Sequence, residues 1–141
     1  PGCAENVVNE SPVLIHDLAA TMTDFAGAEA PWKPDGESNG GVDAPPSKTD
    51  ARSLRPVLEG KSDTHRDYAV SGLDNAKQGI SWRILVDTRY KLVLHEDGST
   101  SLFDLENDPN ELEDASESHQ ETAAAMHARL GELTSFSAGS E

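Results

Sequence analysis

The chain has 141 residues, of which 26 are acidic and 11 basic, and it carries a formal net charge of −15 with 35% hydrophobic and 5% aromatic residues. This length allows one domain with a modest core, and the charge argues against a nucleic-acid partner, because phosphate recognition requires a basic face. The acidic residues are spread along the whole chain, which favours a heavily solvated folded surface, as in a protein built for high salt, over disorder.

The sequence shows no membrane or secretory segment. No apolar run approaches the ~20 residues of a membrane span, and no signal peptide is visible. Cys3 is the only cysteine, so an internal disulfide is excluded. We therefore expect no membrane partner, and the localisation stays open, with the cytoplasm of a salt-loving organism as one candidate.

The beginning of the chain predicts a strand and then a helix. Residues 12–16 (PVLIH) are typical of a short strand, and Asp17 is the expected N-cap of a helix that ends at Gly27. The apolar residues of this helix follow at helical spacing and are Leu18, Met22, Phe25 and Ala26. We therefore expect one apolar face on this helix.

A polar segment and a short helix come next. Residues 28–50 are rich in Gly, Pro, Asp and Ser and nearly free of apolar side chains, which predicts a surface loop or insertion. Residues 53–59 predict a short helix that is closed by Gly60.

The middle of the chain changes to the two-residue period of strands. Residues 80–86 and 90–94 alternate in apolar character around a tight reversal at residues 87–89, and Asp97-Gly98 is a strong hairpin signal before a third strand over residues 101–105. Residues 67–72 are a plausible fourth strand. The sequence thus predicts an α+β fold with a small antiparallel sheet of about four strands.

A helix near the C-terminus is expected to cover one face of this sheet. Ser118 and Glu121 have the spacing of a capping box, and a single stripe follows, formed by Ala123, Met126, Leu130 and Leu133. Alternation groups Trp82 with Ile84 and Val86, so we expect Trp82 in the core. It directs Arg83 and Leu85 to the other face, which must meet the N-terminal helices or something outside this chain.

The acidic stretch at residues 102–114 (LFDLENDPNELED) has two interpretations, a calcium site and a turn. An EF-hand loop that started at Asp104 would have Pro109 at its sixth position and Ala115 at its twelfth, where Gly and Glu are required. Asp108-Pro109 fits the first two positions of a type I turn, with the Asp carboxylate accepting a backbone N–H beyond it. We therefore expect a turn.

Other reactive side chains form no catalytic pattern. No two of the five histidines have the i, i+4 spacing of a helical metal clamp, and Cys3 lies outside any nucleophile motif. The residues alone therefore predict no catalytic constellation.

The order of four segments resembles the C-terminal part of the formylglycine-dependent (type I) sulfatases of the alkaline phosphatase superfamily. These segments are SPVLIHDLAATMTDFAG, DARSLRPVLEG, WRILVDTRYKLV and SLFDLENDPNE, and the likeness spans residues 1 to about 136. It departs at Ala20, where the family usually has Pro, at Phe103, where Tyr is common, and in an insertion within residues 28–50.

The resemblance implies that two parts of the chain belong to different domains of a sulfatase. Residues 1–60 would be the end of the sulfatase α/β domain, and residues 61–141 a C-terminal subdomain. The family takes its nucleophile from C-x-P-S-R or C-x-A-S-R, which residues 3–7 (CAENV) do not match. The formylglycine, the calcium ligands and the sulfate-binding residues would therefore come from an N-terminal catalytic domain, the implied partner, acting on a sulfate ester.

Two functions remain open at this point. The chain is either a supporting part of a sulfate-ester hydrolase, not catalytic alone, or an autonomous acidic module that binds a basic partner or calcium. Arg83 is the one candidate for substrate contact, and a salt bridge across a domain interface is its alternative role.

Overall fold

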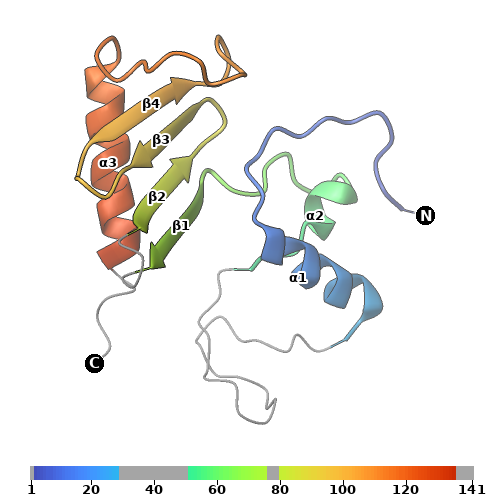
Figure 1. Cartoon of the computed structure of the whole chain (residues 1–141). Coiled ribbons are helices and arrows are strands. Elements are labelled where there is room, and N and C mark those ends of the chain that lie inside the picture. Colours follow the sequence, from blue (N-terminus) through green and yellow to red (C-terminus); the bar gives the residue numbers. More distant parts are fainter. Residues whose placement is uncertain (1, 29–50, 76–79, 136–141) are drawn as a thin grey trace. The chain divides into compact units, whose positions relative to one another are not determined.

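Figure 1 shows the computed structural model of the chain, which describes residues 2–28, 51–75 and 80–135. The chain forms two compact units, residues 1–66 and residues 67–141. The loop or insertion expected over residues 28–50 lies outside the described residues, apart from Ala28. None of the helices in the described ranges is long and apolar enough to cross a membrane.

The first unit contains helix α1 (Ile15–Ala26) and the short helix α2 (Arg55–Leu58). The strand predicted for residues 12–16 is wrong, because residues 12–14 belong to no strand and the helix already begins at Ile15. Asp17 is the third residue of the helix and not its N-cap, and its carboxylate accepts the N–H of Leu14 at 2.9 Å. This bond satisfies an N–H group at the helix start and fixes the first turn.

The predicted ends of both helices are confirmed. Gly27 follows α1 with a φ of 62° and donates its N–H to the carbonyl of Asp24, so the left-handed conformation that favours glycine closes the helix. Gly60 follows α2 with a φ of 68°. The helix predicted over residues 53–59 forms within those limits as α2.

The second unit is a four-stranded antiparallel sheet with one helix against it (Figure 1). Its strands are β1 (Ala69–Asn75), β2 (Ile80–Val86), β3 (Tyr90–Leu94) and β4 (Thr100–Asp104), in the spatial order β1-β2-β3-β4, and its helix is α3 (Gln120–Ser135). This confirms the predicted α+β class, the antiparallel sheet and the C-terminal helix that covers it.

The core of this unit lies between α3 and one face of the sheet. Leu85 pairs with Leu92, and Leu92 with Leu102, so the three side chains form a row across β2, β3 and β4. Leu92 and Leu102 are fully buried, and α3 adds the predicted stripe, with Ala123, Met126 and Leu130 buried and Leu133 packed against them. Burying a leucine side chain contributes about 1.5–3 kcal/mol, so this row accounts for much of the unit's stability.

The assignment of the sheet faces from alternation was wrong. The side chain of Leu85, not that of Trp82, belongs to the buried cluster under α3, and Trp82 is half-buried on the opposite face. The register explains the error, because Leu85 lies opposite Leu92 while Ile84 lies opposite Val93. Apolar residues therefore occupy both faces of β2 and β3, and the period alone does not say which face the helix covers.

The two edges of the sheet differ. At β4, Leu102 accepts a backbone hydrogen bond from Ala115 at 2.7 Å and donates its own N–H to the Asp114 carboxylate at 3.1 Å, so the following segment covers this edge. At β1, residues 71–73 are exposed, and within the described ranges no backbone hydrogen bond reaches the outer edge of the strand. Among the described residues, the β4 edge is therefore the one that the chain itself protects.

Candidate functional site

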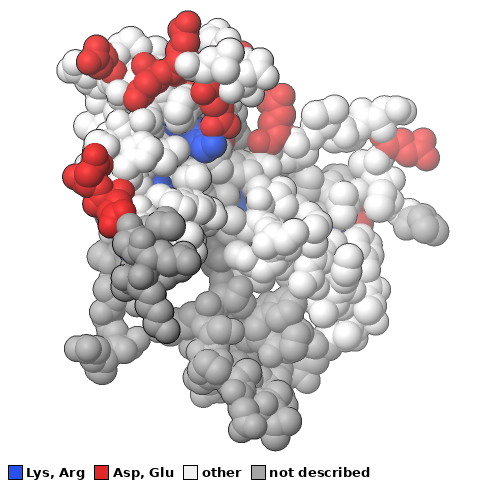
Figure 2. Space-filling model, in the orientation of Figure 1, with Lys and Arg blue, Asp and Glu red and all other residues white. Residues whose placement is uncertain are grey.

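Helix α1 exposes an apolar face. Ile15 is 81% exposed, Leu18 44%, Met22 70% and Phe25 46%, and the steps of three, four and three residues between them place all four on one side of the helix. Figure 2 shows an uncharged, white expanse where Figure 1 places α1. We call these four residues the α1 stripe.

The α1 stripe has the character of a docking surface. Isolated apolar side chains on a surface are common, but four on one helix face form a contiguous patch, and such patches mark interaction sites. The sequence predicted an apolar face here, and the structure shows that this face is exposed while the opposite side of the same helix packs on residues 51–66.

A buried carboxylate holds the opposite side of α1. Asp17 is fully buried, and its two oxygens accept hydrogen bonds from the Arg66 guanidinium, at 2.8 Å from Nε, and from the backbone N–H of Arg52 at 2.8 Å. The His65 ring nitrogen Nε2 lies 3.0 Å from the same carboxylate. Asp17 therefore connects α1 to two segments that are 35 and 49 residues away.

The electrostatics of Asp17 follow from these contacts. Burial acts to raise the pKa of the Asp17 carboxyl, but hydrogen bonds from Arg66, from the backbone of Arg52 and Leu14 and from His65 together hold that pKa well below its usual range. The carboxylate is therefore ionised at neutral pH, and its role here is to fix the helix. Asp17 is not placed to act as a general base, because such a group needs a free lone pair that faces a cavity.

Further contacts along α1 support the same packing. The Thr21 hydroxyl oxygen accepts the N–H of Leu54 at 2.8 Å, and Asp24 accepts hydrogen bonds from the Ser53 hydroxyl at 2.6 Å and from Arg55 at 3.0 Å. The Ser53 and Arg55 hydrogen bonds lower the pKa of Asp24. The α1 stripe is therefore presented by a helix whose other side is anchored along its length.

The acidic stretch at residues 102–114 forms a turn, as expected. Asp108 accepts the N–H groups of Leu112 at 2.6 Å and Glu113 at 2.8 Å, so its carboxylate caps the backbone beyond Pro109. Asp104 binds the Arg89 guanidinium through both oxygens, at 3.2 and 2.8 Å. That contact holds the pKa of Asp104 well below its usual range.

The described residues form no metal site, and the sequence has no C-x-P-S-R or C-x-A-S-R motif from which a formylglycine could form. Within the described ranges, no group of three or more His, Cys, Asp or Glu side chains could hold a metal ion. The carboxylates of Asp104, Asp108 and Asp114 are committed to N–H groups of the turn and to Arg89. The calcium alternative for this stretch is therefore not supported, and we derive no catalytic step through either group.

Arg83 lies on the α3 side of the sheet and not on the side assigned to it from the sequence. It pairs with Gly72 of β1 and Leu94 of β3 and shares the face of Leu85. A Cβ built on Gly72 would lie 2.9 Å from the backbone oxygen of Trp82 and 3.2 Å from the Cγ of Arg83, so glycine at this position allows the close approach of the β2 backbone and of the half-buried arginine. Its proposed contact with substrate stays a prediction.

Comparison with known proteins supports the fold. No protein-family model matches the sequence, and no curated protein matches it. Among solved structures, a 2-O GAG sulfatase matches with a TM-score of 0.64 and 23% identity, over 87% of this chain and 25% of that one. The chain has the fold of the C-terminal part of a sulfatase.

Other structures agree with this sulfatase fold. A protein in complex with its substrate, D-glucosamine-2-N,6-O-disulfate, matches with a TM-score of 0.55 and 21% identity, over 86% of this chain and 23% of that one. The phosphonate monoester hydrolase of Agrobacterium radiobacter matches with a TM-score of 0.54 and 23% identity, over 86% and 24%. The chain thus spans about a quarter of the length of these enzymes.

Proposed function

We propose that this chain is the C-terminal part of a sulfuric ester hydrolase of the formylglycine-dependent sulfatases and that it supports the catalytic domain without being catalytic alone. The α1 stripe carries this proposal, because an apolar helix face anchored from behind by Asp17 is suited to pack on further protein. The match of 87% of the chain to 25% of the 2-O GAG sulfatase supports it.

The two parts predicted from the sequence, whose boundary differs from that of the compact units 1–66 and 67–141, have different tasks in this proposal. Residues 1–60 end the α/β domain and contribute α1 to it, and residues 61–141 form the accessory subdomain, whose sheet is folded around its own core. The nucleophile and the calcium ion belong to the N-terminal catalytic domain, the partner, which hydrolyses a sulfate ester. Arg83 is our candidate in this chain for contact with an anionic group of that substrate.

The gene provides the first test. We expect the coding sequence upstream to be in frame and to encode C-x-P-S-R or C-x-A-S-R, and the longer protein to hydrolyse an aryl sulfate. Because one structural neighbour is a phosphonate monoester hydrolase, a phosphonate monoester is assayed beside it. An upstream sequence without the motif, or a longer protein inactive on the sulfate, contradicts the proposal.

The role of the α1 stripe has a separate test with two independent measurements. In the isolated chain, Met22→Asp should reduce self-association in sedimentation velocity, because it removes an exposed apolar side chain. When the chain and the upstream part are expressed separately and mixed, the same variant should abolish the restored sulfatase activity. Met22→Leu keeps the apolar character and should preserve both properties. Equal activity of Met22→Asp and the unaltered chain in the mixture contradicts the docking role.

A further inference from the structure

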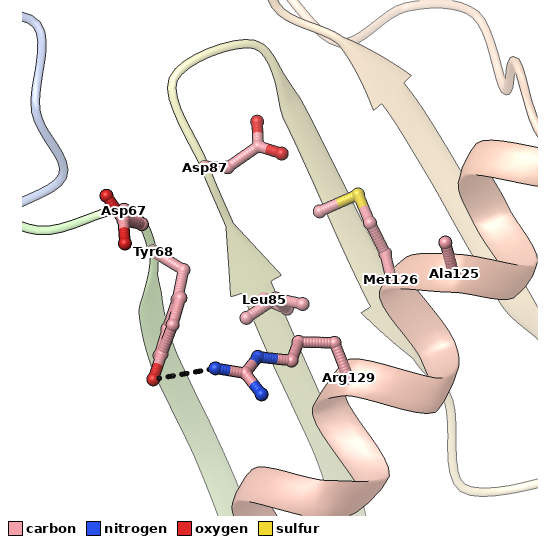
Figure 3. Close-up of a pocket in the computed structure, with 7 residues that line it drawn as sticks. All are labelled: Asp67, Tyr68, Leu85, Asp87, Ala125, Met126 and Arg129. Carbon is pink, nitrogen blue, oxygen red and sulfur yellow. Dashed lines mark hydrogen bonds between the residues drawn. The ribbon is translucent and has the colours of Figure 1, made fainter.

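A small hollow lies between α3 and the ends of β1 and β2. It has a volume of about 210 Å³, and its apolar lining comes from Leu85, Met126 and Ala125, with Tyr68 at its side. Figure 3 shows Asp67 and Asp87 toward one end of this hollow and Arg129 reaching Tyr68 at the other. We call it the Tyr68 hollow.

The size of the Tyr68 hollow limits its ligand. Pockets for drug-sized molecules and cofactors usually have about 300–1,000 Å³, so a hollow of about 210 Å³ is too small for a sulfated sugar and suits a single side chain. Its floor is apolar and consists of side chains that are mostly covered, with Leu85 3% and Met126 7% exposed. A ligand with an apolar stem would therefore replace water over these two side chains.

The charges around the hollow favour a cation. Asp67 is exposed, and within the described residues no hydrogen bond or ion pair reaches its carboxylate. Asp87 uses Oδ1 to accept the N–H groups of Arg89 and Tyr90, at 2.7 and 2.6 Å, which leaves Oδ2 available. Two carboxylates with unused acceptor oxygens therefore border the same apolar floor.

The positive charge at the other end of the hollow, on Arg129, already has partners. The Arg129 guanidinium forms an ion pair with Glu132 at 2.8 Å and lies 5.0 Å from the centre of the Tyr68 ring. Because Arg129 occupies that ring, a second planar guanidinium would find no aromatic surface to stack on. A compact ammonium on a flexible stem needs no such surface.

We propose that the Tyr68 hollow binds a lysine side chain of a partner polypeptide. The methylene groups lie on Leu85 and Met126, as lysine stems do on apolar surfaces, and the ammonium reaches the carboxylates of Asp67 and Asp87. A second copy of this chain is a poor source of the lysine, because two bodies with a net charge of −15 repel each other. The proposal is independent of sulfate-ester hydrolysis.

The test uses the whole 141-residue chain and methyl NMR of Leu85 and Met126. The probe is Nα-acetyl-lysine methylamide, and the control probe is Nα-acetyl-norleucine methylamide, which has a similar stem and no ammonium. We expect the methyl signals of Leu85 and Met126 to shift saturably with the lysine probe and not with the norleucine probe. Equal shifts with the two probes would overturn the proposal, because the carboxylates would then contribute nothing.

Matched variants locate the site. Asp87→Asn keeps the Oδ1 that accepts the two turn N–H groups, so the turn is preserved, and it should weaken binding about two- to fivefold, the range of one partly exposed ion pair. Asp67→Asn should do the same. Ala125→Leu fills the hollow from the helix and should abolish binding, while methyl signals away from it report that the fold is intact.

A variant of a carboxylate outside the hollow is the control that distinguishes binding at this site from general attraction of a cation to an acidic protein. Asp97→Asn changes the β3–β4 turn by the same charge and should leave the affinity unchanged. If Asp97→Asn weakens binding as much as Asp87→Asn, or if Ala125→Leu binds the probe like the unaltered chain, the lysine site does not exist.

Discussion

Removing the charge of Asp17 should unfold the first unit selectively. Asparagine has nearly the same shape as aspartate, so Asp17→Asn mainly removes the negative charge that faces the Arg66 guanidinium. Both side chains are almost fully buried. Breaking one partner of a buried ion pair costs about 3–5 kcal/mol. At ~0.05–0.15 kcal/mol per residue, a unit of residues 1–66 has only about 3–10 kcal/mol in total, so the variant loses a large part of it.

The pH dependence of this loss has a defined sign. The pKa of Asp17 is lower in the folded than in the unfolded chain, where it is about 3.9, so the unfolded state binds more protons as the pH falls. The stabilisation is fully present above pH ~4 and declines below it. The stability difference between Asp17→Asn and the unaltered chain should therefore be largest near neutral pH and shrink under acid conditions.

Amide hydrogen exchange resolved by peptide mass spectrometry measures this effect in each unit. Protection of α1 should fall by about a hundredfold or more in Asp17→Asn, since each 1.36 kcal/mol is a factor of ten. Peptides from β2, β3 and α3 serve as the internal reference and should be unaffected. Asp24→Asn, on the same helix but at a half-exposed ion pair, is the matched control and should change little. Unchanged protection of α1 in Asp17→Asn would refute the assigned role of the carboxylate.

Four further outcomes are expected. Leu92→Ala should cost about 2–5 kcal/mol in chemical denaturation followed by circular dichroism, and Val93→Ala, on the half-buried face, clearly less; equal losses would contradict the core assignment. The thermal midpoint should rise from low salt to molar KCl, because repulsion among 15 net charges is screened over about 10 Å at 0.1 M salt, and a midpoint that stays constant counts against this. The isolated chain should not turn over an aryl sulfate above a heat-treated control, since its sequence has no C-x-P-S-R or C-x-A-S-R motif and its described residues hold no group of metal ligands. In the longer protein of our proposal, Arg83→Ala should lower the thermal midpoint and leave kcat/KM per folded molecule nearly unchanged, whereas a fall of about ten- to a hundredfold at an unchanged midpoint identifies a substrate contact.

Local sequence patterns were sufficient for most of the second unit. The strands alternate with a period of two, and their connections carry recognisable turn residues, such as Asp87, which accepts two N–H groups of its turn, and Gly98, with a φ of 82°. The stripe of α3 has helical spacing and is buried as expected. Each of these signals acts over a few residues, which is why a single sequence reveals them.

The same patterns did not predict features that depend on contacts between residues far apart in the sequence. Both faces of β2 are apolar, so only the register that places Leu85 against Leu92 shows which face meets α3. Residues 12–16 have strand-like composition, but the Asp17 carboxylate binds the N–H of Leu14 and starts the helix at Ile15. Nothing in the spacing of the sequence indicates that Arg66 reaches Asp17, because their contact spans 49 residues.

The unequal edges of the sheet set an upper limit on its growth. Asp114 and Ala115 occupy the outer hydrogen-bonding groups of Leu102, so among the described residues β1 offers the more open edge for another strand. Two sheets that met edge to edge along β1 would each turn a covered β4 edge outward, and no template for a third sheet would remain. Edge-to-edge pairing of this sheet is therefore expected to favour a pair over a longer stack, because a carboxylate and one backbone amide of the following segment occupy the β4 edge at Leu102.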